Sequence, residues 1–430
     1  MSSRSLGVSQ ARPQPLEENL ISHWLLDRSI AFLNHGSYGA TPKVVLEAQT
    51  ASRTRIEARP VEQLERRRDE MLGGAKQAVA QFINAEPKDF GFVTNATGGV
   101  NAVLRSLQFG PGDELVTTSH VYNAIRQAMR HAADRSGATV IEVKIPLPIA
   151  SPEVVVDGIT AALTGRTRLV VIDHITSPTA ILFPVETILE ACAARGIDVL
   201  VDGAHAPGMV DLNVGQLNAS YYTANLHKWV CAPKGSAFLW VRPDKQSGIH
   251  PNTISHFLGE GLAKEFGWQG TRDITAWLCA KDAIDFMAGF GWDQVRRHNH
   301  ELATWVQALL SRQWGVEPSS PLDGSMLGSM VTLPLPDDTR RHKSAAAFQA
   351  KLFDRFHIEV PIIEWDDRWW VRASCQVYNT ADQYERLGEA ILEIATYPDR
   401  SPLRHRGHRG RKRHTDTETQ KDHASNDLTP

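Results

Sequence analysis

The chain has 430 residues, of which 42% are hydrophobic and 22% are charged, the proportions of an ordinary soluble enzyme with two or three domains. Its formal net charge of −3 gives no reason to expect a nucleic-acid or membrane partner. No apolar run approaches the ~20 residues that a membrane helix needs.

The two ends of the chain are assigned as an N-terminal extension and a C-terminal tail. Residues 1–29 form an N-terminal extension with neither an acidic side chain nor an apolar stretch in its first 16 positions, so we expect no secretory signal. Residues 401–430 carry seven Lys or Arg, four Asp or Glu and almost no apolar side chains, which predicts a basic, disordered tail.

From about residue 90 to residue 242, short apolar runs alternate with segments of helical periodicity. The expected strands are 90–94, 114–118, 139–144, 168–173, 198–202, 220–224 and 236–242. The expected helices are 100–107, 122–135, 154–163 and 185–195. This alternation predicts an α/β fold with a mainly parallel seven-stranded sheet covered on both faces, and ligands bind such sheets at the carboxyl ends of the strands.

The rest of the chain divides into two parts. Residues 273–315 have a helical pattern, and residues 328–400 mix strands with helices. We therefore predict a large domain over 30–290, with a crossover segment at 30–60 that packs near the site, and a smaller α/β C-terminal domain over 291–400.

The four cysteines lie far apart, at Cys192, Cys231, Cys279 and Cys375. They form no CxxC pair and no disulfide framework, so a reducing cytoplasm is the simplest compartment and no metal site is expected.

The most informative motifs are Val201-Asp202-Gly203-Ala204-His205 and Asn225-Leu226-His227-Lys228-Trp229. Asp202 ends a short apolar run, and Lys228 follows the next expected strand. Pyridoxal phosphate needs these two residue types, since a lysine amine forms a Schiff base with its aldehyde and a carboxylate keeps its pyridine nitrogen protonated. Each residue taken alone is more often structural, as a turn residue or a surface lysine, so the interpretation also requires a phosphate site.

A candidate phosphate site follows the first expected strand. Asn95-Ala96-Thr97-Gly98-Gly99 reads as a turn that opens a helix. Free backbone N–H groups and the positive end of the helix dipole would meet there, and Thr97 adds a hydroxyl donor. The alternative is that Thr97 only caps the helix. Since Thr97, Asp202 and Lys228 all follow strands, as does Asp173, a parallel sheet would bring them together.

These segments resemble the class V aminotransferase-fold enzymes, which are fold-type I pyridoxal phosphate enzymes, and within them the isopenicillin N epimerase-like family related to cysteine desulfurases. The resemblance covers about residues 30–395 and rests on residues 33–39, 95–101, 201–208, 227–229, 270–273, 372–374 and 378–379. It is specific for fold and cofactor and weak for substrate.

The resemblance implies roles for individual residues. Lys228 would be the Schiff-base lysine and proton carrier, Asp202 the partner of the pyridine nitrogen, and His205 a catalytic contact near the ring hydroxyl. The remaining cofactor contacts would be Thr97, Gly98, Tyr122, which would stack on the ring, Ser177, Asn225, His227 and Thr271. For Tyr122 the alternative is a core aromatic residue on a helix.

The resemblance also implies how the substrate is bound and how chains associate. Arg372 would bind the α-carboxylate, for which a two-pronged guanidinium is well suited, the alternative being a structural ion pair. Asn34, His35 and Arg272 would be further substrate contacts, although Arg272 could equally form an ion pair with Asp273. Thr271 would come from the neighbouring subunit, so a homodimer with shared sites is implied.

The sequence departs from the desulfurases in two places. Ser177 stands where they carry Asn, and residues 331–371 contain no cysteine to act as their nucleophile. Cys375 follows Arg372 inside an expected strand and reads as a core residue. We therefore favour an epimerase acting at an amino-acid α-carbon. A C–S lyase acting on a cysteine derivative, a class V aminotransferase and a non-catalytic binding protein remain as alternatives.

Overall fold

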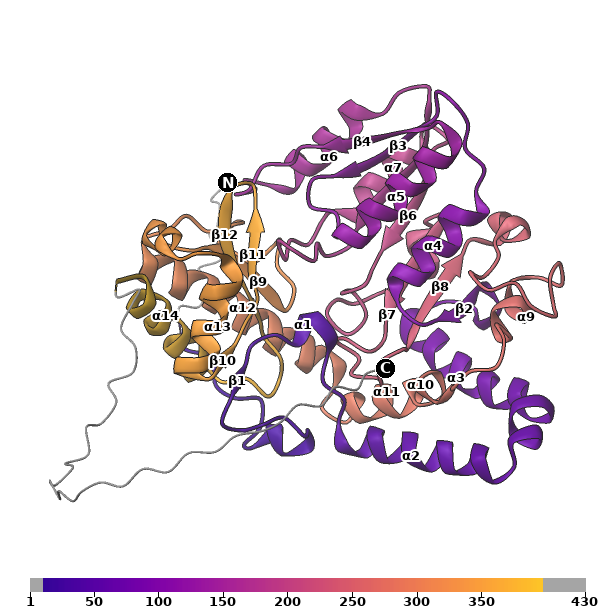
Figure 1. Ribbon diagram of the computed structural model, residues 1–430, viewed down its shortest axis with the longest axis horizontal. Coiled ribbons are helices and arrows are strands. Elements are labelled where there is room, and N and C mark those ends of the chain that lie inside the picture. The colour runs from indigo at the N-terminus through magenta and orange to yellow at the C-terminus, as the bar shows by residue number, and fades with distance from the viewer. Residues whose placement is uncertain (1–10, 397–430) are drawn as a thin grey trace, which may run out of the picture.

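The computed structural model describes residues 11–396, apart from the side chains of residues 340 and 341, and the tail predicted at 401–430 lies outside the described residues. Figure 1 shows two regions, one built on a large sheet and a second, coloured orange to yellow, formed by the last part of the chain. We call them the large region and the C-terminal region.

The large region is built on a seven-stranded sheet in the order β2-β8-β7-β6-β5-β3-β4. Its strands are β2 (Phe90–Val93), β3 (Glu114–Thr118), β4 (Thr139–Val143), β5 (Thr167–Asp173), β6 (Asp198–Asp202), β7 (Tyr221–Asn225) and β8 (Ala237–Val241). Strands β4, β3, β5, β6 and β7 run parallel, and β8 runs antiparallel to both β7 and β2. The predicted mainly parallel sheet is therefore confirmed, with β8 as its reversed strand.

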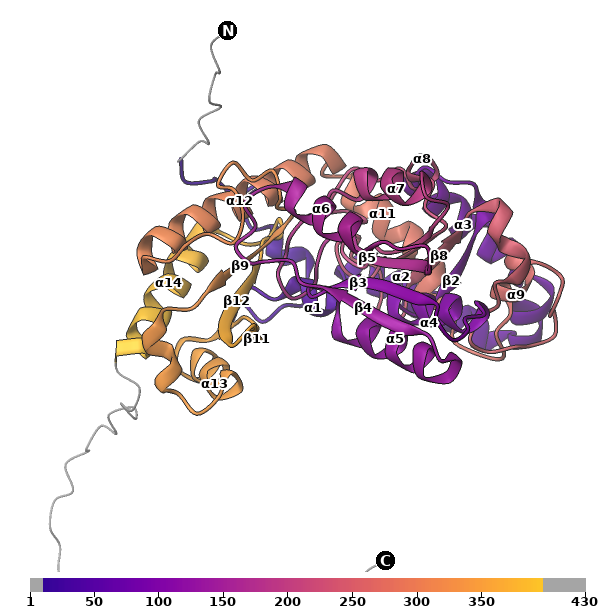
Figure 2. The ribbon, with the colours of Figure 1, turned by 90° about the horizontal axis from the view of Figure 1, so that it is seen from above.

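Helices cover both faces of this sheet (Figure 2). Side chains of alternate positions enter two different cores, because successive residues of a strand point to opposite faces. Along β6, for example, Val199 and Val201 enter one cluster and Leu200 the other. The helices of the large region are α2 (Lys43–Ala58), α3 (Arg68–Ile83), α4 (Ala96–Ser106), α5 (Asn123–Ser136), α6 (Pro152–Ala162), α7 (Val185–Ala193), α8 (Val214–Leu217), α9 (Leu262–Gly267), α10 (Thr275–Leu278) and α11 (Ala280–Ala288).

The C-terminal region has its own sheet and its own core. Its three antiparallel strands lie in the order β11-β12-β9, namely β11 (Ile362–Trp365), β12 (Arg368–Ser374) and β9 (Met330–Pro334). Its helices are α12 (Trp292–Trp314), α13 (Ala345–Phe356) and α14 (Ala381–Thr396). Their apolar faces meet in one cluster, which includes Leu310, Phe348 and Ile391.

The N-terminal segment joins the two regions. Strand β1 (Ala31–Phe32) pairs in parallel with β10 (Ile358–Glu359) of the C-terminal region. The short helix α1 (His35–Tyr38) follows and leads back to the large region. At Gly39 the backbone has φ 70°, and an added Cβ would lie 2.0 Å from the His227 carbonyl oxygen, so only glycine permits this approach.

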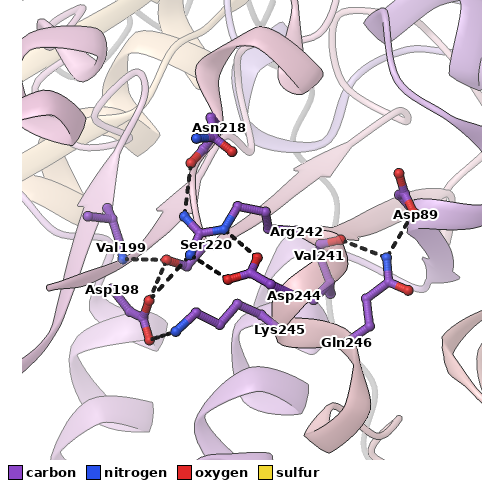
Figure 3. Close-up of polar contacts among 10 residues, drawn as sticks. All are labelled: Asp89, Asp198, Val199, Asn218, Ser220, Val241, Arg242, Asp244, Lys245 and Gln246. Atoms are coloured by element: carbon purple, nitrogen blue, oxygen red, sulfur yellow. Dashed lines mark hydrogen bonds and ion pairs between the residues drawn. The ribbon is translucent and has the colours of Figure 1, made fainter. Parts of the chain in front are cut away.

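The amino end of the sheet is closed by a network of polar contacts (Figure 3). Asp198, the first residue of β6, accepts hydrogen bonds from Ser220 Oγ and Lys245 Nζ, both at 2.8 Å. Arg242 at the end of β8 lies 3.9 Å from the same carboxylate and forms a two-pronged pair with Asp244. The carboxylate here is therefore paired on both oxygens.

Residues 11–396 contain neither a membrane-spanning helix nor a metal-binding cluster. No helix there combines the length and the apolar character needed to cross a bilayer. No group of three or more His, Cys, Asp and Glu side chains in this part of the chain is arranged to hold a metal ion.

Candidate active site

The predicted site residues that follow the strands do meet at the carboxyl end of the sheet. Asp173 ends β5, Asp202 ends β6, and the register places these two residues directly opposite one another. Lys228 lies three positions after the end of β7. Asn225, the last residue of β7, accepts a hydrogen bond at 2.8 Å from the first amide of α4, which ties the turn that contains Thr97 to the same place.

The surroundings of Lys228 on balance disfavour protonation of its amine. Its Nζ is 3.0 Å from His205 Nε2, and the pKa of the amine falls from 10.5 to about 7, first because of burial and then because of the positive charge of Arg372. His205 is 1% exposed, and burial followed by the Lys228 charge holds its pKa well below the ordinary value. A large share of Lys228 is therefore a neutral, nucleophilic amine near neutral pH.

Asp202 and Asp173 form a pair of buried carboxyl groups. They are 3% and 2% exposed, and directly paired residues of parallel strands project from the same face of a sheet. Asp202 accepts the Ala204 amide at 3.0 Å, whereas Asp173 Oδ2 has no hydrogen-bond partner among the described residues. Burial raises the pKa of Asp202 to about 6, and burial together with the Asp202 charge raises the pKa of Asp173 well above its ordinary value.

Helix α4 begins differently from the prediction. Asn95, not Thr97, is its N-cap, and the Asn95 Oδ1 accepts the Gly98 amide at 2.7 Å. The Gly98 amide, which was predicted to bind phosphate, therefore already donates its hydrogen to the Asn95 side chain. The alternative that Thr97 caps the helix is wrong. Thr97 lies in the first turn and is half-buried, so its hydroxyl is available to a ligand at the positive end of the helix.

His227 lies directly before Lys228 in the sequence. Its Nδ1 is 3.0 Å from the carbonyl oxygen of Ser236, and burial lowers its pKa to about 4. The ring is therefore neutral at pH 7. Since a carbonyl can only accept, Nδ1 carries the hydrogen, and Nε2 is left as an acceptor.

A cavity of about 480 Å³ opens beside Lys228. Its lining comes from helix α1, from the segments after β3, β5 and β7, and from the β11–β12 hairpin of the C-terminal region with Pro361 just before it. Its lining residues include Ser37, Tyr38, Tyr122, Arg126, Ser177, Lys228, Ile363, Glu364, Trp365 and Arg372. The volume is typical of pockets that bind small molecules.

Arg372 lies on β12 and projects its guanidinium into this cavity. It is 5% exposed, and it donates to Ser177 Oγ at 3.1 Å and to Ser37 Oγ at 3.0 Å. Its Nε has no partner, and no carboxylate pairs with it within the described chain. The alternative of a structural ion pair is therefore wrong. The guanidinium also donates to the Ser177 carbonyl oxygen at 2.5 Å, so its partners are all neutral oxygens, and a buried cation of this kind suits an anionic ligand.

Tyr122 is the N-cap residue of α5 and lines the cavity with 45% of its surface exposed. The alternative of a core aromatic residue is therefore wrong. Tyr122 and Lys228 line the same cavity, which suits a residue that stacks on a planar ligand.

The structure does not bring Asn34 or His35 to the cavity. His35 is fully buried, and its ring contacts Tyr378 Oη at 2.7 Å and the Lys228 carbonyl oxygen at 2.9 Å. Asn34 Oδ1 accepts a hydrogen bond from the Ser37 hydroxyl at 2.5 Å. In this segment it is Ser37, which no sequence pattern indicated, that lines the cavity and contacts Arg372.

Thr271 and Arg272 lie apart from Lys228 in the described chain. Thr271 is exposed and borders a separate cavity of about 570 Å³, which Arg68, Phe257 and Trp268 also line. Arg272 lies over the Trp277 ring at 5.1 Å. Asp273 pairs with Arg53 at 2.8 Å, so the alternative of an Arg272–Asp273 ion pair is wrong.

Comparison with known proteins decides the family, because residues 32–351 match the aminotransferase class V family. The chain belongs to the class V aminotransferase family. Its cofactor is pyridoxal 5′-phosphate.

Relatives of similar length carry two different activities in their names. The chain is 35% identical to isopenicillin N epimerase of Amycolatopsis lactamdurans, over 86% of this chain and 96% of that protein. It is 33% identical to putative L-cysteine desulfhydrase 1 of Oryza sativa subsp. japonica, over 86% and 84%. The apo cysteine desulfurase of Thermococcus onnurineus NA1 has the same fold, with a TM-score of 0.74, 20% identity and coverage of 90% and 100%.

The residues at this site fit pyridoxal phosphate on independent grounds. The buried carboxyl pair with one unpartnered oxygen suits a protonated ring nitrogen, and the Lys228 amine suits an aldehyde. The start of α4, with the Thr97 hydroxyl, suits a phosphate. These residues would therefore provide a partner for the ring nitrogen, the aldehyde and the phosphate of the cofactor.

Proposed function

We propose that this class V enzyme epimerises an α-amino acid, as the name of its 35% identical relative indicates. The observation that carries the proposal is the unpaired, buried Arg372 in one cavity with a largely neutral Lys228. One group binds a carboxylate, and the other accepts a proton from the adjacent carbon. The chemistry therefore takes place at a carbon that bears a carboxylate.

Each residue has a separate task in the proposed reaction. Arg372, held by Ser37 and Ser177, orients the substrate carboxylate. Lys228 would hold the cofactor, and its amine would carry the α-proton. Asp202 would keep a proton at the ring nitrogen, and Tyr122 would offer its ring as a stacking surface. Bound pyridoxal phosphate supplies the electron-accepting ring that stabilises negative charge at the α-carbon.

Thr97, His205 and Asn225 complete the proposed cofactor site, whereas His227, whose Nε2 is an acceptor, has no ring hydrogen left to donate to a phosphate. Thr97 would donate to the phosphate, and His205 would contact the ring beside Lys228, to which it is already bonded. Asn225 would act indirectly, because its Oδ1 accepts a hydrogen bond from the first amide of α4 and so holds the start of that helix in place. Because the four cysteines are buried and free, we also propose the cytoplasm as the compartment.

A persulfide-forming desulfurase is disfavoured by the state of the cysteines. None of the four lines the cavity. Burial raises the pKa of the Cys231 and Cys375 thiols to about 12 and that of Cys192 and Cys279 to about 11. A thiolate nucleophile is therefore missing at the site.

The second candidate function is a C–S lyase, which the 33% identity to a putative cysteine desulfhydrase favours. Product analysis separates the two. The loaded enzyme would be incubated in D₂O with isopenicillin N and, separately, with L-cysteine. An epimerase inverts the centre, incorporates one deuterium at the α-carbon and forms no pyruvate. Release of pyruvate, ammonia and sulfide from L-cysteine without any inversion activity would overturn the proposal in favour of the lyase.

We also propose a homodimer in which Thr271 completes the phosphate site of the partner. Thr271 is exposed and borders a cavity with apolar lining, which a second subunit could cover. Mixing inactive Lys228→Ala chains with inactive Thr271→Val chains tests this. Shared sites should restore activity in one site of each heterodimer. No recovery after proven subunit exchange would mean that each chain builds its own site.

A further inference from the structure

Trp229 is the neighbour of Lys228 in sequence, and its indole reaches the residue that contacts Lys228 in space. Trp229 is 1% exposed, and its Nε1 lies 3.3 Å from His205 Nδ1. The other nitrogen of the same ring, Nε2, is the one 3.0 Å from Lys228 Nζ. The three side chains therefore form one chain of hydrogen bonds, Trp229 to His205 to Lys228.

The direction of these two hydrogen bonds follows from which of the three groups can donate a hydrogen. An indole nitrogen donates and never accepts, so His205 Nδ1 must accept. A neutral imidazole carries one hydrogen, which leaves it on Nε2. His205 is neutral because it is buried among Lys228, Arg372, His35 and His227. Nε2–H then points at the lysine nitrogen as a donor, and only an unprotonated amine has a lone pair to accept it.

We propose that Trp229 is a positioning residue that fixes His205 in the Nε2–H tautomer and thereby holds the Lys228 amine in its neutral, reactive form. The proposal rests on the proposed role of Lys228, yet its central measurement concerns the tautomer alone. A protonated Lys228 would require His205 Nε2 as an acceptor, which would break the Trp229 hydrogen bond. Trp229 therefore lowers the affinity of Lys228 for a proton.

Other charged groups face Lys228 and act in known directions. Asp202 from β6 and Asp173 from β5 favour the charged amine, whereas Arg372 from β12 disfavours it. These influences remain in place when Trp229 is changed. The effect of the indole hydrogen bond is therefore separable from theirs by substitution of Trp229 alone.

The first test is the tautomer, measured on the wild-type protein without cofactor. Histidine ring ¹⁵N shifts would be recorded, with His205 assigned by the signals that His205→Gln removes. We expect a neutral ring with hydrogen on Nε2, and the same tautomer in Lys228→Ala, because Trp229 and not Lys228 fixes it. Hydrogen on Nδ1 in the wild type would overturn the proposal, whatever the role of Lys228.

The second test is the pH dependence of cofactor capture by the apoprotein, followed by visible absorbance. In Trp229→Phe the ring shape is kept and the donor is lost, so the midpoint should rise by about half a unit to one unit. Trp314→Phe is the matched control, since it also removes a buried indole donor, which bonds Gly388 O at 3.1 Å in the C-terminal region. An unchanged midpoint in Trp229→Phe, or an equal shift in Trp314→Phe, would contradict the assignment.

Discussion

The two ends of β6 each carry an aspartate, and the two carboxyl groups differ in how fully they are paired within the protein. At the amino end, Asp198 is bonded to Ser220 and Lys245, with Arg242 close by (Figure 3). At the carboxyl end, Asp202 has one backbone donor and faces a second carboxyl, Asp173. The Asp198 charge is therefore balanced by side chains of the protein, whereas the Asp202 carboxyl is left with room for a ligand to pair with it.

The difference shows that the groups suited to catalysis lie at the carboxyl end of the sheet. A buried, incompletely paired carboxyl costs stability, and proteins retain such groups where function requires them. The paired end instead joins three strands and the turn after β8. Substitutions at the two ends should therefore separate activity from stability.

The largest effect concerns lysine reactivity. Because the neutral amine is the reactive form and its fraction grows as pH rises to the pKa, capture of pyridoxal phosphate by Lys228 should rise with pH and level off above about 7. An ordinary lysine with a pKa near 10.5 would be about 10³-fold less reactive at pH 7. Stopped-flow absorbance measures the rate constant. A plateau near pH 10 would contradict the expected environment.

The protein loaded with pyridoxal phosphate in this experiment also shows which lysine bonds the cofactor. After borohydride reduction, peptide mass mapping should find the cofactor on Lys228. Lys245, which is held by Asp198 at the amino end, should remain unmodified. An adduct on Lys234 would show that the cofactor lysine was assigned wrongly.

Asp202→Asn should lower turnover by about 10²-fold or more, because a neutral amide cannot hold a proton on the ring nitrogen. Asp198→Asn is the matched change at the other end of β6 and should leave turnover within about twofold. Steady-state rates of the loaded variants, with circular dichroism as a folding check, give the comparison. Equal losses in both variants would mean that the ends of the strand do not differ in function.

Arg372→Lys should weaken amino-acid binding by about tenfold, because the charge stays but the two-pronged geometry is lost. Titration of the visible cofactor band with an amino acid measures the affinity. A methyl ester of the same amino acid is the control, since it lacks the carboxylate and should bind weakly to the wild type. Equal affinity of acid and ester would remove Arg372 from this role.

The smallest effect is on stability. A carboxyl with a raised pKa in the folded chain contributes stability at low pH, and that contribution is lost as pH rises through the folded value. Asp173→Asn has no charge to bury, so its apoprotein should be more stable than the wild type by about 1–2 kcal/mol at alkaline pH, with a smaller gain in acid. Asp198→Asn should lose about 1 kcal/mol. Urea unfolding measures both, and destabilisation of Asp173→Asn at alkaline pH would contradict an ionised, unpaired carboxyl there.

The sheet and its functional edge could be predicted from the sequence for a simple reason. Apolar runs such as Val199–Val201 mark buried strands, and parallel strands bring their following residues to one edge. Asp202 and Lys228 therefore met as expected. Helices α2 and α3 were not predicted, because weak amphipathic patterns in a charged segment give little periodic signal.

The contacts that depend on side-chain direction could not be predicted in this way. Ser37 reaches Arg372 only because the N-terminal segment crosses between the regions, and no local pattern reports that path. The Trp229–His205 contact joins two loops whose shapes are set by packing. The Asn95 cap is different, since Asn is a preferred capping residue and its position at the turn was a usable signal.

The crossing N-terminal segment also has a consequence for the order of folding during synthesis. Strand β1 pairs with β10, and the Gly36 amide bonds Ser374 Oγ, 338 residues further along the chain. At a translation rate of about 5–20 residues per second, the first strand waits for its partner for tens of seconds. Ser37 and Arg372, which line the cavity beside Lys228, come together only at the end of this interval. A nascent or prematurely terminated chain can thus build the sheet before it can close the pocket, so the cavity beside Lys228 is complete only after Arg372 has been made.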